Sequence, residues 1–376
     1  MRAFAASGRR RPERFPAFRR RRQSGGAPAG LLASAERRPK ADFLSIAESF
    51  NWALNAAYFE RDLLRNERVI GNFRRRHVSA LTKAMEERPP GKIAPVAELT
   101  NPDPEIIDRE FIRKRKPVVL KGAARDWPAA RLWSFDFFKE NYGDSQLFIA
   151  DEHFSRKREG LGYRIKLTPY AMRDFVGEVQ KGAGIYLKFL PVFTQHPELR
   201  AHLDMEAMNR WTRGRLARCE ITNEFYMGGA RTITHLHTER SDIFHACFVG
   251  KKRWRLYAPS QTRYLYPIPA RTLFIGSEVD FLAPDYSVHP WFRYANGYET
   301  VIEAGDVLYF PAYYWHAVEN PEATISANCL WYDKWRSLRA LPMHWINGEI
   351  AARNKGGTIQ QFLDVFDNRI LRSLHA

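Results

Sequence analysis

Short runs of alternating apolar and polar residues mark several strands along the chain. Each run is rich in β-branched or aromatic residues and is bounded by residues that favour turns. The runs are PVVLKG (117–122), LFIAD (147–151), GIYLKFL (184–190) and ITNEFYM (221–227). We expect these four runs to be strands that join a sheet, and WSFDFFKENYG (133–143) to be a helix between the first two.

The run KKRWRLY (251–257) is informative because its two faces differ. Alternation places Lys252, Trp254 and Leu256 on one face. The other face carries Lys251, Arg253, Arg255 and Tyr257. Burying the ammonium group of a lysine on the apolar face costs free energy unless an anion binds it. The strand therefore predicts an acidic ligand inside the fold. The alternative is an edge lysine whose ammonium group reaches solvent.

Apolar residues at helical spacing are found near both ends of the chain. Asp42 can cap a helix, and the pattern ends at the RPPG sequence of residues 88–91. We expect residues 42–90 to form a helical segment that packs on the main domain, either as scaffold or as an interaction surface. Residues 338–352 and 357–374 also carry apolar stripes typical of helices.

Two segments carry a potential metal site. In TITHLHTE (232–239), a strand would turn His237 and Glu239 to the same side, and His316 in GDVLYFPAYYWHAV (305–318) would come from a remote strand. Two histidines and one carboxylate are the ligand set of non-haem iron oxygenases, so the three residues are predicted to be metal ligands and catalytic. His235 shares the face of His237 by alternation, which leaves a second triad open. Either segment alone is also compatible with a purely structural role.

The chain resembles a known family over a long stretch. The likeness extends from PVVLKGAARDWPA (117–129) to NCLWYDKW (328–335) and is strongest in THLHTERSDIFHACFVGKKRWRLYAP (234–259) and GDVLYFPAYYWHAVEN (305–320). These segments resemble the JmjC and cupin-like oxygenases that use Fe(II) and 2-oxoglutarate, among them the asparaginyl hydroxylase of hypoxia-inducible factor and bacterial cupin-like proteins. The resemblance implies a mainly β fold with flanking helices. Its centre would be a double-stranded β-helix, a jelly-roll barrel of eight strands in two facing sheets, over about residues 217–333 of a domain at 91–335.

The resemblance also implies roles for single residues. Lys252 matches the lysine that pairs with the distal carboxylate of 2-oxoglutarate, and Thr234 and Tyr186 match hydroxyl groups that bind the same carboxylate. Asn328 resembles a polar residue that lines this pocket. Strict alternation places Thr234 on the opposite face to His237, so a bend between them is required if both line the site.

Three positions depart from the family pattern. Glu239 replaces the aspartate of the nearest relatives, although glutamate is the ligand in the lysine-demethylase branch. Ile243 and His245 replace an asparagine and an aromatic residue, and both are expected to face the pocket. The substrate therefore cannot be assigned by resemblance, and the long insert at 271–297 is expected to shape its entrance.

The implied activity is that of a dioxygenase that couples conversion of 2-oxoglutarate to succinate with hydroxylation of a protein side chain or a small molecule by O2. Demethylation of an N-methyl group would use the same chemistry. An alternative is a cupin-like protein that binds a metal without turnover, and a third is a scaffold that has lost catalysis. Terminal helices form a dimer in the hydroxylase resembled, so residues 336–376 are predicted either to form a homodimer or to fold onto their own barrel.

The N-terminal segment of the chain is strongly basic. Of a net charge of +17, most lies in residues 1–40, where twelve Lys and Arg residues face two acids. We expect residues 1–41 to be disordered and to be an organelle-targeting segment, an arm that associates with nucleic acid, or non-native sequence translated from an upstream start codon. No apolar stretch approaches the ~20 residues of a membrane span. The three scattered cysteines predict a reducing compartment, so the cytoplasm is expected.

Overall fold

The computed structural model describes residues 89–150, 167–190, 192–267 and 275–340. The predictions for residues 1–88 and for the helix at 357–374 therefore lie outside the described residues, as does the proposed terminal dimer contact. Of the helix predicted at 338–352, only the beginning is described. It starts earlier than predicted, as α10 (Lys334–Ala340). Within the described residues, no helix has the length and apolar character needed to cross a membrane.

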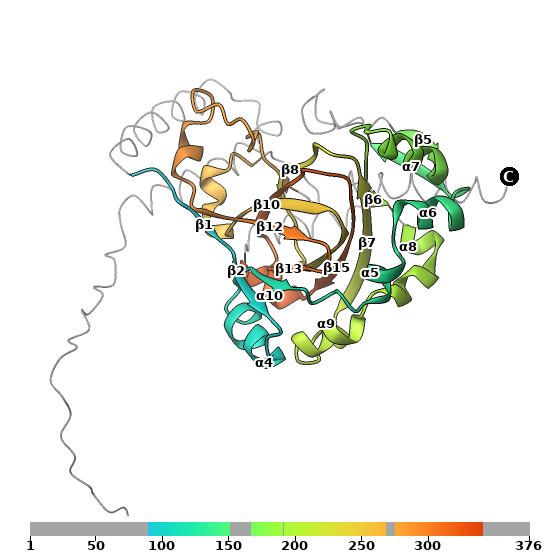
Figure 1. The fold of residues 1–376 in the computed structure, drawn as a ribbon. Helices are drawn as coiled ribbons and strands as arrows, with labels where there is room; N and C mark the ends of the chain where they lie inside the picture. Colours follow the sequence, from blue (N-terminus) through green and yellow to red (C-terminus); the bar gives the residue numbers. More distant parts are fainter. Residues whose placement is uncertain (1–88, 151–166, 191, 268–274, 341–376) are drawn as a thin grey trace, which may run out of the picture. The chain divides into compact units, whose positions relative to one another are not determined.

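Eight strands form the core of the fold as two sheets of four (Figure 1). The first sheet contains, in spatial order, β12 (Gly297–Glu303), β10 (Lys251–Tyr257), β14 (Trp315–Asn320) and β8 (Thr232–Thr238). The second contains β13 (Val307–Phe310), β9 (Asp242–Val249), β15 (Thr324–Tyr332) and β7 (Glu220–Gly228). All neighbouring pairs are antiparallel. The predicted eight-stranded double-stranded β-helix is confirmed.

Additional strands widen both sheets. The first gains β1 (Ile93–Pro95) and β11 (Ile275–Gly276), and the second gains β2 (Ala97–Thr100), β3 (Val118–Lys121) and β6 (Tyr186–Leu190). β4 (Gln146–Ala150) is a strand as predicted, but it pairs with β5 (Leu167–Ala171) in a separate two-stranded sheet. The other three predicted strands, β3, β6 and β7, all belong to the second sheet.

Helices cover the outer face of the second sheet (Figure 1). They are α5 (Pro128–Leu132), α6 (Phe135–Asn141), α7 (Met172–Gln180), α8 (Val192–Gln195) and α9 (Met205–Trp211). Shorter turns are α4 (Pro104–Ile106), the π-helix η1 (Ile107–Ile112) and the 3-10 helices η3 (Pro197–His202), η4 (Leu216–Arg218), η5 (Pro259–Tyr264) and η6 (Pro290–Tyr294). Trp133 packs edge-on against Phe225 and Phe248 of the sheet, with ring centroids 5.5 and 4.9 Å apart. The predicted helix at 133–143 is confirmed as α6.

The space between the two sheets holds a second apolar cluster and the polar groups described below. Trp254 and Leu256 of β10 pack there against Ile243 and Leu330 of the opposite sheet. Lys252 lies on the same face and is fully buried, so the predicted inward face of β10 is confirmed. β10 follows a tight turn at Gly250, whose φ of +75° and closeness to the carbonyl oxygen of Ala323 leave no room for a Cβ atom.

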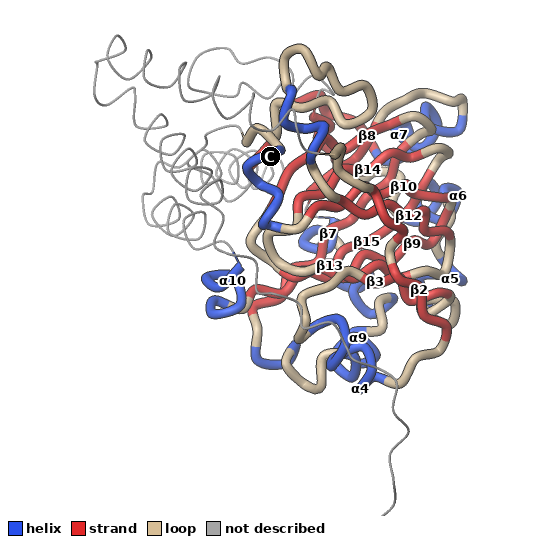
Figure 2. Tube along the Cα trace, turned by 90° about the vertical axis from the view of Figure 1, so that its left-hand side faces the viewer, coloured by secondary structure: helices blue, strands red, loops and turns tan. Residues whose placement is uncertain are grey.

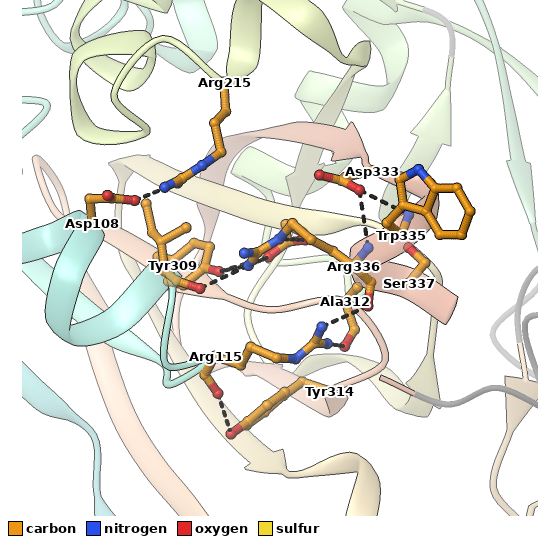
Figure 3. A network of polar contacts seen from close by, with 12 residues as sticks. Asp108, Arg115, Arg215, Tyr309, Ala312, Tyr314, Asp333, Trp335, Arg336 and Ser337 are labelled. Carbon is orange, nitrogen blue, oxygen red and sulfur yellow. Dashed lines mark hydrogen bonds and ion pairs between the residues drawn. The ribbon is translucent and has the colours of Figure 1, made fainter. Parts of the chain in front are cut away.

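A buried ionic network fixes α10 against the barrel (Figure 3). Asp242, fully buried at the start of β9, accepts hydrogen bonds from Arg336 of α10 at 2.8 Å and from the Tyr309 hydroxyl at 2.7 Å. Arg115 donates to the carbonyl oxygens of Arg336 and Ala312 at 2.7 and 3.0 Å. Figure 2 shows the strands packed side by side with α10 outside them. The start of β9 and the helix are thus joined through one carboxylate.

Arg336→Ala is expected to lower the free energy of unfolding by about 3 kcal/mol, because it leaves the carboxylate of Asp242 buried without its cation. Arg339→Ala is the matched control, since Arg339 is exposed on the same helix and should change stability by less than about 0.5 kcal/mol. Urea unfolding followed by tryptophan fluorescence measures both. Equal effects of the two substitutions would show that the network contributes nothing specific.

Candidate metal centre

His237, Glu239 and His316 come together at one end of the first sheet. Their ligand atoms all lie within 4.8 Å of one another, and they form the only such group of three found among the described residues. His237 of β8 is directly opposite His316 of β14, and their ring centroids are 4.1 Å apart. Glu239 follows the last residue of β8 and holds one carboxylate oxygen 3.9 Å from Nε2 of His316. A single small ion can therefore contact all three side chains.

The hydrogen bonds of both imidazoles orient them for coordination. Nδ1 of His237 donates to the carbonyl oxygen of His235 at 2.7 Å, and Nδ1 of His316 donates to that of Tyr314 at 3.0 Å. The Nε2 lone pair of each ring is then the coordinating one. Burial lowers the pKa of His237 to about 4 and that of His316 well below its ordinary value, so both rings are neutral, as metal ligands must be. These donor atoms fit a divalent transition metal such as iron.

The second triad left open by the sequence is not formed. His235 is not part of the ligand group, and its contribution is the backbone carbonyl that orients His237. A further backbone contact joins the two ligand segments: the N–H of Tyr313 donates to the carbonyl oxygen of Glu239 at 2.7 Å. Tyr313 has a φ of +61°, an uncommon backbone conformation for a tyrosine. The turn before β14 is thereby tied to the carboxylate ligand.

Lys252 lies deeper in the barrel with its ammonium group completely buried. Nζ donates to the hydroxyl oxygens of Tyr186 and Ser326, both at 3.0 Å, and lies 5.5 Å from the ring centre of Tyr226. None of the described carboxylates forms an ion pair with it. An ammonium group held only by neutral hydroxyls and rings, away from water, fits a site that receives an anionic ligand.

Thr234 shares the face of His237 because β8 contains a bulge. The strand register pairs His237 with His316 but Thr234 with Val318, so β8 takes three steps where β14 takes two. The extra residue reverses the alternation between Thr234 and His237. The bend that the sequence required is therefore present, and Thr234 is buried.

Tyr186 and Asn328 also face the interior. Burial alone would raise the pKa of the Tyr186 hydroxyl, but the charge and hydrogen bond of Lys252 outweigh it and the pKa is lowered. Asn328 of β15 donates from Nδ2 to the Tyr226 hydroxyl at 2.9 Å and to the carboxylate of Glu224 at 3.1 Å. The structure thus brings Lys252, Tyr186 and Asn328 into one barrel with the metal ligands.

Four polar residues of the interior were not singled out by the sequence. They are Lys188, Glu224, Tyr226 and Ser326. The alternation of ITNEFYM does place Glu224 and Tyr226 on one face, but that face could equally have been exposed to solvent. Ile243 and His245 face the interior as expected, with His245 edge-on to Trp254 at a ring distance of 4.7 Å.

Fold and site together define a barrel protein with two histidines and one carboxylate placed where they could hold a metal ion. The chain belongs to the cupin-like domain family, which matches residues 104–337. It is 28% identical over 237 residues to "Lysine-specific demethylase 8" of Xenopus tropicalis, covering 63% of this chain and 52% of that protein. It is 30% identical over 238 residues to the protein of the same name in Danio rerio, covering 61% of this chain and 56% of that protein.

A third relative is "Bifunctional peptidase and (3S)-lysyl hydroxylase JMJD7" of Homo sapiens, 23% identical over 259 residues, covering 62% of this chain and 82% of that protein. The chain thus spans about half the length of the first two curated relatives. The names of these relatives include demethylation and hydroxylation, and the third relative is also named as a peptidase. The likeness to the asparaginyl hydroxylase remains a resemblance of motifs.

Proposed function

We propose that this protein is an Fe(II)- and 2-oxoglutarate-dependent dioxygenase that hydroxylates a protein side chain or a small molecule. The observation that carries the proposal is Lys252: a fully buried ammonium group, without an ionic partner among the described residues, in the same barrel as the triad of His237, Glu239 and His316. A metal-binding protein without an anionic co-substrate has no need of this cation. The relatives named as hydroxylase and demethylase support an oxygenase.

The residues of the site divide into two groups. His237, Glu239 and His316 would hold iron, which together with 2-oxoglutarate and O2 supplies the oxidising power when bound. Lys252 would neutralise the distal carboxylate of 2-oxoglutarate. The same carboxylate would accept hydrogen bonds from the hydroxyl groups of Tyr186, Thr234 and Ser326. The protein's own contribution is to orient both ligands and to keep water away from them.

The walls of the barrel support this exclusion of water. Phe310 lies 4.7 Å and Trp254 lies 6.0 Å from the His316 ring, and both aromatic side chains are buried. β11, at the start of the described part of the long insert, pairs with His237 and Thr238 of β8. The insert therefore begins beside the metal ligands, which favours a role for it at the substrate entrance.

Fe(II)-loaded protein is expected to convert 2-oxoglutarate to succinate and to add one oxygen atom to a component of a peptide library or cell extract. Succinate is followed by NMR and the added oxygen by mass spectrometry. Protein loaded with Zn(II) is the control and should form no succinate. Formaldehyde release from an N-methylated component would indicate demethylation by the same site. Absence of Fe(II)-dependent succinate formation in every mixture would contradict the proposal.

The second candidate function is metal binding without turnover. It is compatible with the triad, since two histidines and a carboxylate also bind Zn(II) or Ni(II). It gives no reason for the burial of Lys252 beside Tyr186 and Ser326. Binding of metal together with failure to bind 2-oxoglutarate would favour this candidate.

A further inference from the structure

The candidate metal ligands Glu239 and His316 adjoin two connections between strands. Glu239 begins the first connection (residues 239–241), which joins β8 to β9. His316 lies just after the second connection (residues 311–314), which joins β13 to β14. Bonds from a metal such as Zn(II) to nitrogen or oxygen ligands are about 2.0–2.2 Å long, so a small shift of either connection would move a ligand out of reach. The contacts that hold these two connections therefore bear on metal binding.

Helix α10 is hydrogen-bonded to the chain directly behind Glu239. The hydroxyl group of Ser337, which is completely buried, donates to the carbonyl oxygen of Arg240 at 2.6 Å. At the end of the same connection, the carboxylate of Asp242 accepts two hydrogen bonds from the guanidinium group of Arg336, at 2.8 and 3.2 Å. Both donors belong to α10. The helix thus holds the first connection at two points within three residues of the carboxylate ligand.

The second connection is tied to the same helix through Arg115. The guanidinium group of Arg115 donates to the carbonyl oxygen of Arg336 at 2.7 Å and to that of Ala312 at 3.0 Å (Figure 3). The Tyr314 hydroxyl donates to the carbonyl oxygen of Arg115 at 3.1 Å. The carbonyl oxygen of Tyr314 in turn accepts Nδ1 of His316 at 3.0 Å. Hydrogen bonds therefore link α10, through Arg115 and the second connection, to the imidazole ligand.

We infer that Ser337, Arg336 and Arg115 are positioning residues of the metal centre, which hold the two connections at the separation that lets Glu239 and His316 bind one ion. The inference rests on the proposed function, since it requires that the triad binds a metal. It adds a coupling between the metal centre and α10. Because such a coupling is reciprocal, a bound ion fastens α10 by the same factor by which α10 strengthens binding of the ion.

The first test is calorimetric titration of the full chain with Mn(II). Ser337→Ala removes the hydrogen bond to Arg240, and Arg115→Met removes the guanidinium group while keeping an unbranched side chain. Each substitution should weaken Mn(II) binding about tenfold, because loss of an outer partner of a metal ligand commonly costs 10- to 100-fold. The visible absorption spectrum of Co(II)-loaded protein should change in both variants, since it depends on the geometry of the ligands.

Asp108→Asn separates positioning from a general loss of stability. Asp108 is buried and forms ion pairs with Arg113, at 2.7 Å, and with Arg215 (Figure 3). Among the described residues, its side chain has no hydrogen bond to either connection. The substitution should lower the melting temperature at least as much as Ser337→Ala, because two cations lose their carboxylate. The affinity for Mn(II) should nevertheless stay within about twofold of the wild type.

Hydrogen exchange followed by mass spectrometry tests the reciprocal effect. Mn(II) should slow exchange of the backbone amides of α10 severalfold in the wild type but not in His316→Ala. The amides of α7, which packs on the second sheet, are the internal reference and should not respond. Exchange in α10 that is independent of Mn(II) in the wild type would contradict the coupling.

The outcomes for the inference and for the proposed function differ. Wild-type affinity for Mn(II) in both Ser337→Ala and Arg115→Met would overturn the inference, as would an equal loss of affinity in Asp108→Asn. If the wild type itself binds no Mn(II), the proposed function fails. If the wild type binds Mn(II) and the variants bind it equally well, only the positioning role is wrong.

Discussion

His316→Ala is expected to weaken metal binding more than about 100-fold and to abolish succinate formation. Loss of an outer partner of a metal ligand alone commonly costs 10- to 100-fold in affinity or activity, and here a ligand itself is removed. His237 and Glu239 come from the end of one strand, whereas His316 is the contribution of β14. Two ligands from one segment cannot enclose the ion against competition from water. Metal content after dialysis and succinate by NMR measure the two effects.

His235→Ala is the matched control for this substitution. His235 is two residues from His237 but outside the ligand group, and the backbone carbonyl that orients His237 is retained in the variant. Metal content and succinate formation should stay within a few-fold of the wild type. Full activity of His316→Ala would show that His316 is not a metal ligand. Loss of metal in His235→Ala but not in His316→Ala would show that His235 is a ligand instead.

The inward and outward faces of single strands could be predicted because alternation is a local signal, whereas the barrel was what the family resemblance implied. In β10, alternation alone separates the buried Lys252 and Trp254 from Arg253, which forms ion pairs with Glu299 and Glu319 on the outer face. The same rule requires a bend in β8 if both side chains line the site, because Thr234 and His237 are an odd number of residues apart. A bulge supplies it.

What escaped prediction depends on contacts between distant parts of the chain. The composition of β4 indicates a strand but not its partner, which is β5 in a separate two-stranded sheet. The apolar stripe predicts a helix from Leu338, whereas α10 begins at Lys334, where the Asp333 side chain accepts hydrogen bonds from the backbone N–H groups of Trp335 and Arg336.

Glu224 shows the limit of alternation most clearly. In ITNEFYM the apolar residues Phe225 and Met227 face the helices outside the barrel, so the polar face looks like a solvent-exposed one. Only closure of the two sheets turns that face into the interior and sets Glu224 beside Asn328. Periodicity separates the two faces of a strand but does not say what each of them meets.

The decisive experiment for the co-substrate is substitution of Lys252. Lys252→Met removes the charge and keeps most of the side-chain volume, so loss of packing is small. A charge pair in a partly desolvated site is commonly worth about 2–5 kcal/mol when one partner is removed. The affinity for 2-oxoglutarate should therefore fall at least about 30-fold, at about 1.4 kcal/mol per tenfold. Metal binding should persist, because Lys252 donates to Tyr186 and Ser326 and not to a metal ligand.

Lys251→Met distinguishes loss of this one ammonium group from a general loss of positive charge. Lys251 is the neighbouring residue on β10, but it is exposed and its ammonium group is 3.9 Å from the carboxylate of Glu303 on the outer face. Because solvent screens that pair, its removal should leave 2-oxoglutarate affinity unchanged within about twofold. Calorimetry with Mn(II) in place of iron gives both affinities without turnover. If Lys252→Met and Lys251→Met both bind 2-oxoglutarate like the wild type, the buried cation does not serve this co-substrate, and metal binding without turnover becomes the better account of the site.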